Sequence, residues 1–297
     1  MPISKGIFRV YALAIGLARA TGLTKPLRKV MGPLAGRIIT GVTGNSSNIY
    51  SVNGHKMVLT SSGAYPPVAM AMDNYESETT EQFERTLTAG MIVLDIGAHV
   101  GYYSLLAARL VGPSGKVFSF EPEIDNYQLL RQNIELNGYE NIYTNQCAVS
   151  KKVGETTLFL ANLDSGRHSI YNHSLPQKGS YTVPTVTIDS FLEEQGWPKV
   201  DLVKIDVEGA EPDVLEGMGQ TVKRSSELKL IMEFNPALLM NSGTDPDRFL
   251  ETPTAWGKKI FSIDGKAGLT PIDPAEWPDL VKILAAKETS INLYCSS

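Results

Sequence analysis

The stretch IVLDIGAHVGYYSLLA, residues 92–107, decides the fold of this 297-residue chain. Three β-forming residues lead to Asp95, Gly97 and Gly101 follow it, and a helical pattern of small and apolar residues comes next. This order is typical of a strand, a tight turn and the N-terminus of a helix. Because ligands of open α/β sheets bind beyond the carboxyl ends of the strands, we expect a cofactor at this turn.

The turn differs from the G-x-G-x-x-G of dinucleotide-binding proteins, which holds a pyrophosphate at a helix N-terminus. It reads D-x-G-A-H-x-G, and Asp95 would repel a pyrophosphate. Glu121 ends the next apolar run, VFSFEP, where a carboxylate can accept hydrogen bonds from both ribose hydroxyls. S-adenosylmethionine has cationic groups and no phosphate, which suits Asp95, and a ribose diol, which suits Glu121. In the alternative interpretation, Asp95 caps the next helix and Glu121 is a surface charge.

From residue 91 onward, apolar runs alternate with helical stretches, which is the pattern of a parallel sheet covered on both faces. Strands are expected at 91–96, 116–121, 142–146, 201–206, 228–234, 259–263 and 290–295. Helices are expected at 102–111, 124–137, 211–218 and 246–257. Residues 151–190 break the alternation, because two β-rich stretches flank a polar loop, and this predicts a β-hairpin insertion over the sheet edge.

Several blocks of this region resemble the FkbM family of S-adenosylmethionine-dependent methyltransferases. The blocks, within residues 73–295, are VLDIGAHVGYYSL, FSFEP, NYQLLRQNIELNG, TVTIDSFL, VDLVKIDVEGAEPDVLEGM and LIMEFNP. The resemblance implies the class I methyltransferase fold, a Rossmann-like three-layer α/β sandwich with a seven-stranded, mostly parallel sheet whose last strand is antiparallel. It also implies O-methylation of a sugar or a polyketide-type natural product, so the expected acceptor is a hydroxyl in a glycan, a glycolipid or a glycosylated natural product.

The resemblance also implies which residues bind the cofactor. They are the turn residues Asp95, Gly97, Ala98, His99 and Gly101, the strand end Glu121 and Pro122, the helix residue Asn126, and Glu76 near the methionine end. His99 stands where the family usually has asparagine. An imidazole still donates to a methionine carboxylate, and the affinity for the cofactor would then vary with pH.

The segment LVKIDVEGAE is the expected place for the chemistry. Lys204 and Asp206 lie two apart on one side of a predicted central strand, with Glu208 and Glu211 beyond it. A buried lysine needs a charge partner, and Glu233 at the end of the next strand is the expected one. Asp206 is the first choice for the general base or hydroxyl acceptor and Glu208 the second, with Lys204 as electrostatic organiser.

Two alternatives remain open for these charges. Lys204, Asp206 and Glu233 form either part of the active site or a buried ion network that only fixes the sheet. Glu211 either contacts substrate or is a favourable charge in the first turn of a helix.

The polar loop of the predicted insertion offers further candidates. Arg167 and His168, with Asp164 and His173, are placed to bind substrate, together with Glu233, and His168 is an alternative base. Two metal sites are alternatives: the D-x3-H-x4-H residues of the loop, and a magnesium ion bound by Asp206 and a neighbouring acid. Spacing within a loop is a weak signal for a metal site, because no helix fixes which way the side chains point. We therefore expect that no divalent metal is required.

The charge is divided unevenly along the chain. Residues 1–72 contain eight basic and no acidic side chains, which leaves 19 basic and 32 acidic residues, a net charge of −13, in the methyltransferase domain predicted at 73–297. The basic extension is predicted to be helical and to end in a small hairpin at 42–60. Its apolar run VYALAIGLA, residues 10–18, is too short to span a bilayer. It is expected to be a docking helix or an interfacial segment, with a signal peptide and a solvated helix as the alternatives.

Three functional classes remain. An O-methyltransferase for a saccharide or another hydroxyl-bearing small molecule is favoured over a nucleic-acid methyltransferase, because the acidic body would repel phosphate. A non-catalytic S-adenosylmethionine-binding protein is disfavoured by the intact acids at 206 and 233. Cys147 and Cys295 suggest no disulfide framework, which fits a reducing compartment, and we expect a cytoplasmic protein. Through its basic extension, the protein is expected to make a peripheral contact at the inner membrane face. The oligomeric state is open.

Overall fold

The computed structural model describes residues 49–59, 70, 75–162, 165–173, 176–264 and 268–297. The chain divides into two units, Met1–Tyr75 and Glu76–Ser297, which are described separately. In the first unit, β1 (Ile49–Val52) pairs antiparallel with β2 (His55–Val58), which confirms the predicted hairpin. Its two turn residues, Asn53 and Gly54, both have positive φ, as a tight hairpin turn requires. The predicted helix of the extension lies outside the described residues.

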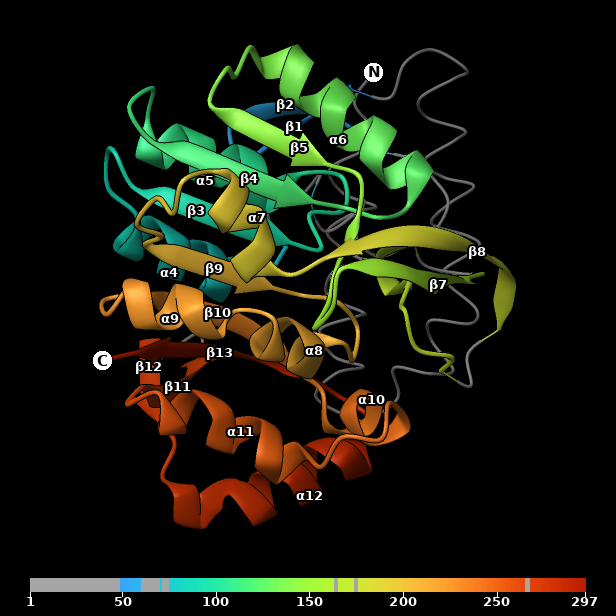
Figure 1. Cartoon of the computed structure of the whole chain (residues 1–297), viewed down its shortest axis with the longest axis vertical. Coiled ribbons are helices and arrows are strands. Elements are labelled where there is room, and N and C mark those ends of the chain that lie inside the picture. The colour runs from blue at the N-terminus through green and yellow to red at the C-terminus, as the bar shows by residue number, and fades with distance from the viewer. Residues whose placement is uncertain (1–48, 60–69, 71–74, 163–164, 174–175, 265–267) are drawn as a thin grey trace, which may run out of the picture. The chain divides into compact units, whose positions relative to one another are not determined.

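The second unit is built on an eight-stranded sheet, in the order β12-β11-β13-β10-β9-β3-β4-β5 (Figure 1). The parallel strands are β3 (Ile92–Ile96), β4 (Lys116–Phe120), β5 (Ile142–Asn145), β9 (Leu202–Ile205) and β10 (Lys229–Phe234). The last strand, β13 (Ile291–Ser296), lies antiparallel between β10 and β11 (Lys259–Asp264). All seven predicted strands are therefore present. The structure adds an edge strand, β12 (Gly268–Pro271), which the sequence did not predict.

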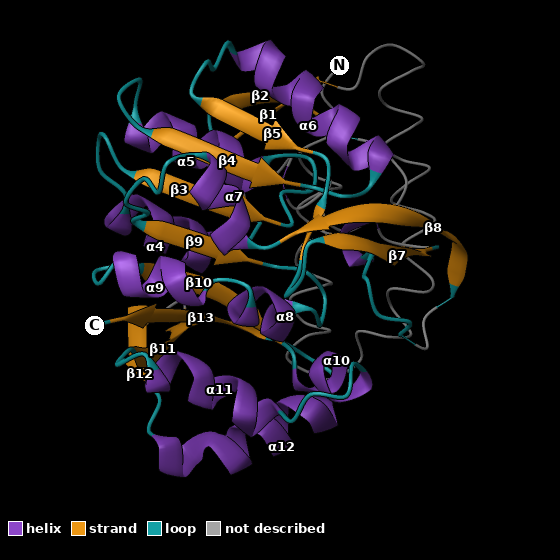
Figure 2. Cartoon of the chain, viewed as in Figure 1, coloured by secondary structure: helices purple, strands orange, loops and turns teal. Residues whose placement is uncertain are grey.

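Helices cover both faces of this sheet, which confirms the predicted class I α/β architecture (Figure 2). The predicted helices are α5 (Tyr102–Val111), α6 (Ile124–Asn137), α8 (Glu211–Glu216) and α11 (Pro246–Ala255). Five more were not predicted: α4 (Ser77–Thr86), α7 (Ile188–Glu194), α9 (Gly219–Arg224), α10 (Pro236–Asn241) and α12 (Trp277–Lys287). The residues Phe234, Asn235 and Pro236 link the end of β10 to the start of α10. The Asn235 side chain accepts a hydrogen bond from Leu238 N and so caps the helix.

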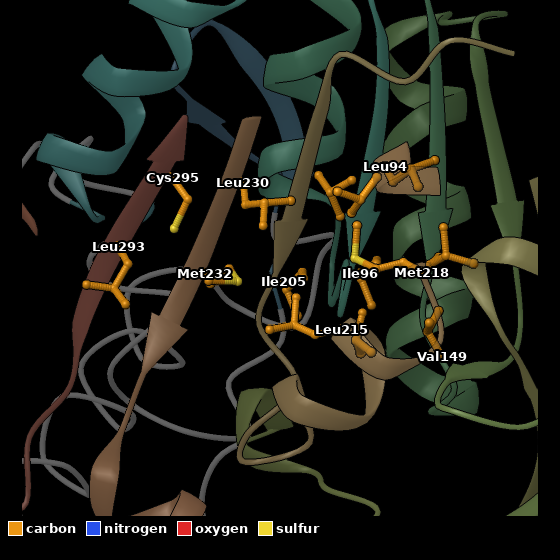
Figure 3. Packing of buried hydrophobic residues seen from close by; sticks show 14 of the residues in the cluster. Leu94, Ile96, Val149, Ile205, Leu215, Met218, Leu230, Met232, Leu293 and Cys295 are labelled. Carbon is orange, nitrogen blue, oxygen red and sulfur yellow. The ribbon is translucent and has the colours of Figure 1, made fainter. Parts of the chain in front are cut away.

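The core lies between the central strands and the helices on the face that α7 and α8 cover. Leu94 and Ile96 of β3, Ile205 of β9 and Met232 of β10 are buried together with Leu215 of α8 (Figure 3). On the same face, the ring of Phe191 in α7 meets those of Phe118 and Phe120 edge-on. Because the central strands are buried on both faces, charged side chains within them stand out, and the two such residues in β3 and β9 are Asp95 and Lys204.

The predicted insertion is a hairpin of β7 (Gly154–Ala161) and β8 (Gln177–Val186), joined through a short 3-10 turn, η1 (Ser165–Arg167). The two-residue strand β6 (Ala148–Val149) pairs parallel with the base of β8. We call residues 154–186 the insertion hairpin. Figure 1 shows it projecting past the carboxyl ends of the parallel strands. Its place confirms the predicted insertion and brings its polar loop to the ligand-binding edge of the sheet. No helix in the described part of the chain is long and apolar enough to cross a membrane.

Candidate functional site

The turn after β3 requires glycine because it lies against the end of β9. Gly97 has a φ of 81°, and a Cβ added there would lie 1.9 Å from the backbone oxygen of Asp206. Gly101 has a φ of 95°, and its Cβ would lie 2.7 Å from Leu130 Cδ1. The amides of Gly97 and Ala98 donate to the carbonyl of Phe120, at 3.0 and 2.9 Å. The predicted cofactor turn therefore joins the ends of β4 and β9.

Asp95 is buried at the end of β3 with one carboxylate oxygen unsatisfied. Its Oδ2 accepts from Ser104 Oγ at 2.6 Å, whereas Oδ1 has no hydrogen-bond partner among the described residues. Burial raises the pKa of Asp95, and the positive charge of Lys204 opposes that shift. A buried oxygen without a donor is costly, so this position favours a ligand that brings a donor or a positive charge.

Glu121 lies at the corresponding end of β4 and is held by the turn. Its Oε2 accepts from His99 N at 2.8 Å, and its Oε1 accepts from Glu123 N at 3.0 Å and from Asn126 Nδ2 at 3.5 Å. Burial is the main reason that its pKa rises to about 7. A carboxylate oxygen can accept two hydrogen bonds, and Oε2 accepts only one from the described residues, so Glu121 retains acceptor capacity for a hydroxyl donor.

Gly97 and Glu121 line one pocket of about 550 Å³, counting the part open to solvent, whereas Asp95 and Gly101 are not among its lining residues. Its polar wall contains Gly97, His99, Glu121, Pro122 and Asn126, five of the predicted cofactor residues. Its apolar wall is formed by Phe120, Cys147, Val149 and Leu158. Asp206 and Val207, from the loop after β9, also line it. Asp206 of the predicted chemical site thus lines the same pocket as part of the predicted cofactor site, whereas Lys204 and Glu208 are not among the lining residues.

The insertion hairpin covers the pocket through Ser165 of η1. Ser165 Oγ lies 2.9 Å from His99 Nε2, and the Ser165 carbonyl accepts from Asn126 Nδ2 at 3.0 Å. Ser165 was not predicted as a site residue, because a serine in a polar loop carries no sequence signal for ligand binding.

Lys204 pairs with Asp206, and the expected pair with Glu233 is wrong. Lys204 Nζ donates to Asp206 Oδ2 at 2.9 Å and lies 4.6 Å from the centre of the Tyr103 ring. Two residues apart on a strand, Lys204 and Asp206 point to the same side, and this brings their charged ends together. Burial alone would lower the pKa of Lys204, but the carboxylates of Asp206, Asp95 and Glu76 hold it above its ordinary value.

Glu76 joins this charge network from the start of α4. Its Oε2 accepts from Tyr103 Oη at 2.7 Å and from Asn292 Nδ2 at 3.2 Å. Burial is the largest cause of its raised pKa. The structure thereby brings Glu76 to the Lys204 side of the site. Tyr103 and Asn292 were not predicted, although Tyr103 lies inside the opening motif.

Three carboxylates converge beside Lys204. Asp206, Glu208 and Glu233 each offer an oxygen, and these atoms lie within 4.8 Å of one another. We call these three residues the acid group. Burial, followed by the charge of Asp206, raises the pKa of Glu233 to about 8, and burial beside Glu233 and Asp206 raises that of Glu208 well above its usual range. Glu233 Oε2 accepts no hydrogen bond from the described residues.

An all-oxygen donor set of this kind suits a hard cation such as magnesium. The other metal interpretation, D-x3-H-x4-H, gains no support from its histidines, because His168 and His173 do not join the acid group. Its Asp164 lies outside the described residues.

The remaining candidates occupy different places. His168 lines the pocket, where its Nδ1 accepts from Ala161 N at 3.0 Å and burial lowers its pKa to about 4. Arg167 Nε lies 3.9 Å from Glu208 Oε2. The Glu211 carboxylate accepts from Val207 N and Gly209 N, which orders the loop between β9 and α8. Burial raises the pKa of Glu211 to about 7.

The raised carboxyl pKa values predict that stability falls as the pH rises. Burial raises the pKa of Glu121 and Glu211 to about 7 and that of Glu233 to about 8 in the folded protein, whereas the ordinary pKa of a glutamate is 4.5. The folded state therefore holds protons that the unfolded chain has released. We expect the free energy of unfolding in urea to decline between about pH 5 and pH 8, and Glu233→Gln to make this decline shallower. An unchanged slope in that variant would contradict the raised pKa of Glu233.

Comparisons with known proteins identify the family of the chain. The model of the FkbM methyltransferase domain matches residues 95–251. Methyltransferase sdnD of Sordaria araneosa is 28% identical over 45% of this chain and 62% of its own length. Hexuronic acid methyltransferase AglP of Haloferax volcanii is 26% identical over 43% of this chain and 49% of its own length. 31-O-demethyl-FK506 methyltransferase FkbM of Streptomyces tacrolimicus is 29% identical over 44% of this chain and 61% of its own length.

The matched part of the chain thus spans about half to three-fifths of the length of these relatives. Among solved structures, the methyltransferase FkbM from Methylobacillus flagellatus aligns with a TM-score of 0.42 at 14% identity, over 73% of this chain and 50% of that one. The family model covers more than half of the chain, including the cofactor turn, the Glu121 strand end and the acid group. The chain therefore belongs to the FkbM methyltransferase domain family.

Proposed function

We propose that the protein is an S-adenosylmethionine-dependent O-methyltransferase that acts on a hydroxyl of a sugar in a glycan, a glycolipid or a glycosylated natural product. The observation that carries the proposal is the single pocket lined by both Glu121 and Asp206. It supports the proposal because Glu121 can accept a hydrogen bond from a hydroxyl and Asp206 offers a carboxylate that can accept a proton. Two relatives bear names that specify a hexuronic acid and a natural-product acceptor, which supports this acceptor class.

The candidate site residues fit the cofactor by their chemistry. The unsatisfied Asp95 Oδ1 suits the ammonium group, Glu121 suits the ribose hydroxyls, and His99 suits the methionine carboxylate. We place Glu76 near the methionine end, and Pro122 and Asn126 beside the ribose. When bound, the cofactor supplies a methyl group on a sulfonium centre, which is attacked in line by an oxygen.

The acceptor hydroxyl must lose its proton as it attacks, because free alkoxide is inaccessible near neutral pH. We propose Asp206 as the group that accepts this proton, and Glu208 as the second choice. Lys204 donates a hydrogen bond to Asp206 and thereby orients its carboxylate. His168 is the alternative base. Glu233, Arg167 and Glu211 complete the acceptor side of the proposed site.

Calorimetric titration of the purified protein with S-adenosylmethionine and S-adenosylhomocysteine tests the cofactor assignment. We expect micromolar binding by the wild type and a loss of at least about tenfold in Asp95→Asn and Glu121→Gln, because each variant removes a charged acceptor (about 1.4 kcal/mol per tenfold). Glu135→Gln, an exposed acid of α6, is the matched control and should bind normally. Absence of binding by the wild type would refute the proposed function.

Release of S-adenosylhomocysteine in the presence of candidate acceptors tests the acceptor class. Turnover with uronic acids or neutral glycosides supports O-methylation of a sugar, whereas turnover only with RNA or DNA supports the nucleic-acid alternative. Binding without turnover on any acceptor favours the non-catalytic alternative.

The same assay tests the expectation that no divalent metal is required. Turnover that persists in EDTA supports this expectation. Turnover that is lost in EDTA and restored by magnesium overturns it and points to the acid group as the site of the ion.

We further propose that the protein works in the cytoplasm and that its basic extension makes a peripheral contact with anionic membrane. The support is the charge of residues 1–72, which carry eight basic and no acidic side chains. The full chain should pellet with vesicles that contain phosphatidylserine but not with neutral vesicles, and high salt should abolish the binding. Equal recovery with both vesicle types would refute the contact.

A further inference from the structure

Glu208 has an unfavourable backbone conformation, which contacts with neighbouring residues must stabilise. Its φ is 52°, in the left-handed region, which is unfavourable for a residue with a Cβ. It lies in the loop between β9 and α8, between Asp206 and Gly209. This conformation directs the Glu208 side chain, so a change in it would move the carboxyl relative to the acid group.

Two side chains of the insertion hairpin donate to the carbonyl of Glu208. Ser169 Oγ lies 2.8 Å from that oxygen, and His173 Nε2 lies 2.7 Å from it. Both residues are almost fully buried, with 3% and 4% of their surface exposed. A third residue of the hairpin, Arg167, lies near the other end of Glu208, with Nε 3.9 Å from Oε2.

Ser169 is fixed by the strand beside it. Its backbone exchanges two hydrogen bonds with Phe159 of β7, at 2.8 and 3.2 Å. Its Oγ accepts from Tyr171 N at 3.1 Å, and it therefore uses its own hydrogen for the Glu208 carbonyl. The position of this donor is thus set by the hairpin.

His173 is fixed by packing against Gly209. A Cβ at Gly209 would lie 3.0 Å from Cε1 and Nε2 of the imidazole, so the ring rests on the loop at the residue after Glu208. Burial lowers the pKa of His173, and a carbonyl can only accept, so the neutral ring carries its hydrogen on Nε2. The imidazole acts here as a donor.

We propose that Ser169 and His173 are positioning residues that hold the Glu208 backbone, so that its carboxyl stays in the acid group with Asp206 and Glu233. The proposal deepens the proposed function, on which it rests for the role of the acid group. In this proposal the insertion hairpin has two roles: it covers the proposed cofactor pocket, and it fixes the position of the Glu208 carboxyl in the acid group.

Titration of the Glu208 carboxyl by NMR tests the proposal without an acceptor. The full chain is labelled with ¹³C at glutamate Cδ, and Glu208→Gln identifies the resonance. The charged groups that face Glu208 are Glu233 of β10, Asp206 after β9, Glu211 of α8 and Arg167 of η1. In the wild type, the resonance should titrate well above the ordinary range of a glutamate.

In His173→Leu, which removes the donor, we expect this midpoint to fall by about one unit or more, because the released carboxyl turns toward water. In His173→Gln, whose Nε2 can take the place of the imidazole Nε2, the midpoint should stay near that of the wild type. Rescue by glutamine separates a lost donor from a general loss of packing. An unchanged midpoint in His173→Leu overturns the proposal, and so does an equal fall in both variants.

Ser169→Ala removes only one oxygen atom and provides the test if His173→Leu does not fold. It should shift the midpoint in the same direction, and an unchanged midpoint in a folded Ser169→Ala protein would overturn the role of Ser169. The calorimetric titration with S-adenosylhomocysteine distinguishes a failure of the proposed function from a failure of the role proposed for Ser169 and His173. If the wild type does not bind it, the proposed function fails, whereas the Glu208 titration still decides whether the hairpin holds this residue.

Discussion

Replacing Gly97 with alanine is expected to cost more than about 4 kcal/mol of stability and to abolish binding of S-adenosylhomocysteine. The added Cβ would lie 1.9 Å from the backbone oxygen of Asp206 and 2.9 Å from its carbonyl carbon. A backbone atom directly after β9 cannot move aside as a flexible side chain can, so the turn and the end of β9 must separate. Urea unfolding and calorimetry measure the two effects.

Gly112→Ala is the matched control for this variant. Gly112 also has a positive φ, 63°, but a Cβ there would meet nothing within 4 Å. Its ψ of −176° lies in a region that favours glycine, so Gly112→Ala should cost only the conformational penalty of about 1–3 kcal/mol and leave cofactor affinity unchanged. Equal losses in the two variants would show that backbone strain, and not the contact with Asp206, makes glycine necessary at position 97.

Asp206→Asn is expected to lower kcat by about 10²- to 10⁴-fold while S-adenosylhomocysteine still binds. Asparagine keeps an oxygen for Lys204 Nζ but cannot accept a proton from a hydroxyl. Lys204 also retains the charges of Asp95 and Glu76, so the fold should survive. The measurement is the initial rate of S-adenosylhomocysteine release with an acceptor found in the panel, alongside urea unfolding.

The control is Asp201→Asn, at the other end of the same strand. Asp201 Oδ2 accepts from Ile92 N at 2.8 Å, far from the carboxyl ends of the strands. This change should lower stability modestly and leave kcat intact. If Asp206→Asn instead destabilises the protein and retains high activity, then Lys204 and Asp206 form a structural ion network.

Much of the architecture could be predicted because it depends on patterns within the sequence. The apolar runs identified all seven main strands, and the glycine turn located α5, whose bounds the structure reproduces. The prediction failed where local signals are weak. Helix α10 begins at a proline directly after a strand, and α12 starts with tryptophan and proline and ends in a left-handed residue without glycine.

The site was predictable as a set of residues but not as a set of contacts. Spacing along one strand placed Lys204 and Asp206 on the same side, yet it could not decide between Asp206 and Glu233 as the partner of the lysine. The left-handed conformation of Glu208 depends on donors that lie 39 and 35 residues earlier in the chain. Ser165, Ser169 and Asn292 were missed because single polar residues acquire their roles only through tertiary packing.

The insertion hairpin sets a limit on how the enzyme could be re-engineered. Ser165 contacts the predicted cofactor turn, and Ser169 and His173 contact the loop of Glu208, so the segment between β7 and β8 is part of the proposed active site. Residues 177–180, in the half of β8 farther from the sheet, are exposed. A chimaera that exchanges the whole hairpin to alter the choice of acceptor would therefore also remove parts of the catalytic scaffold. Grafts confined to the exposed part of β8 preserve those contacts and are the safer units of exchange.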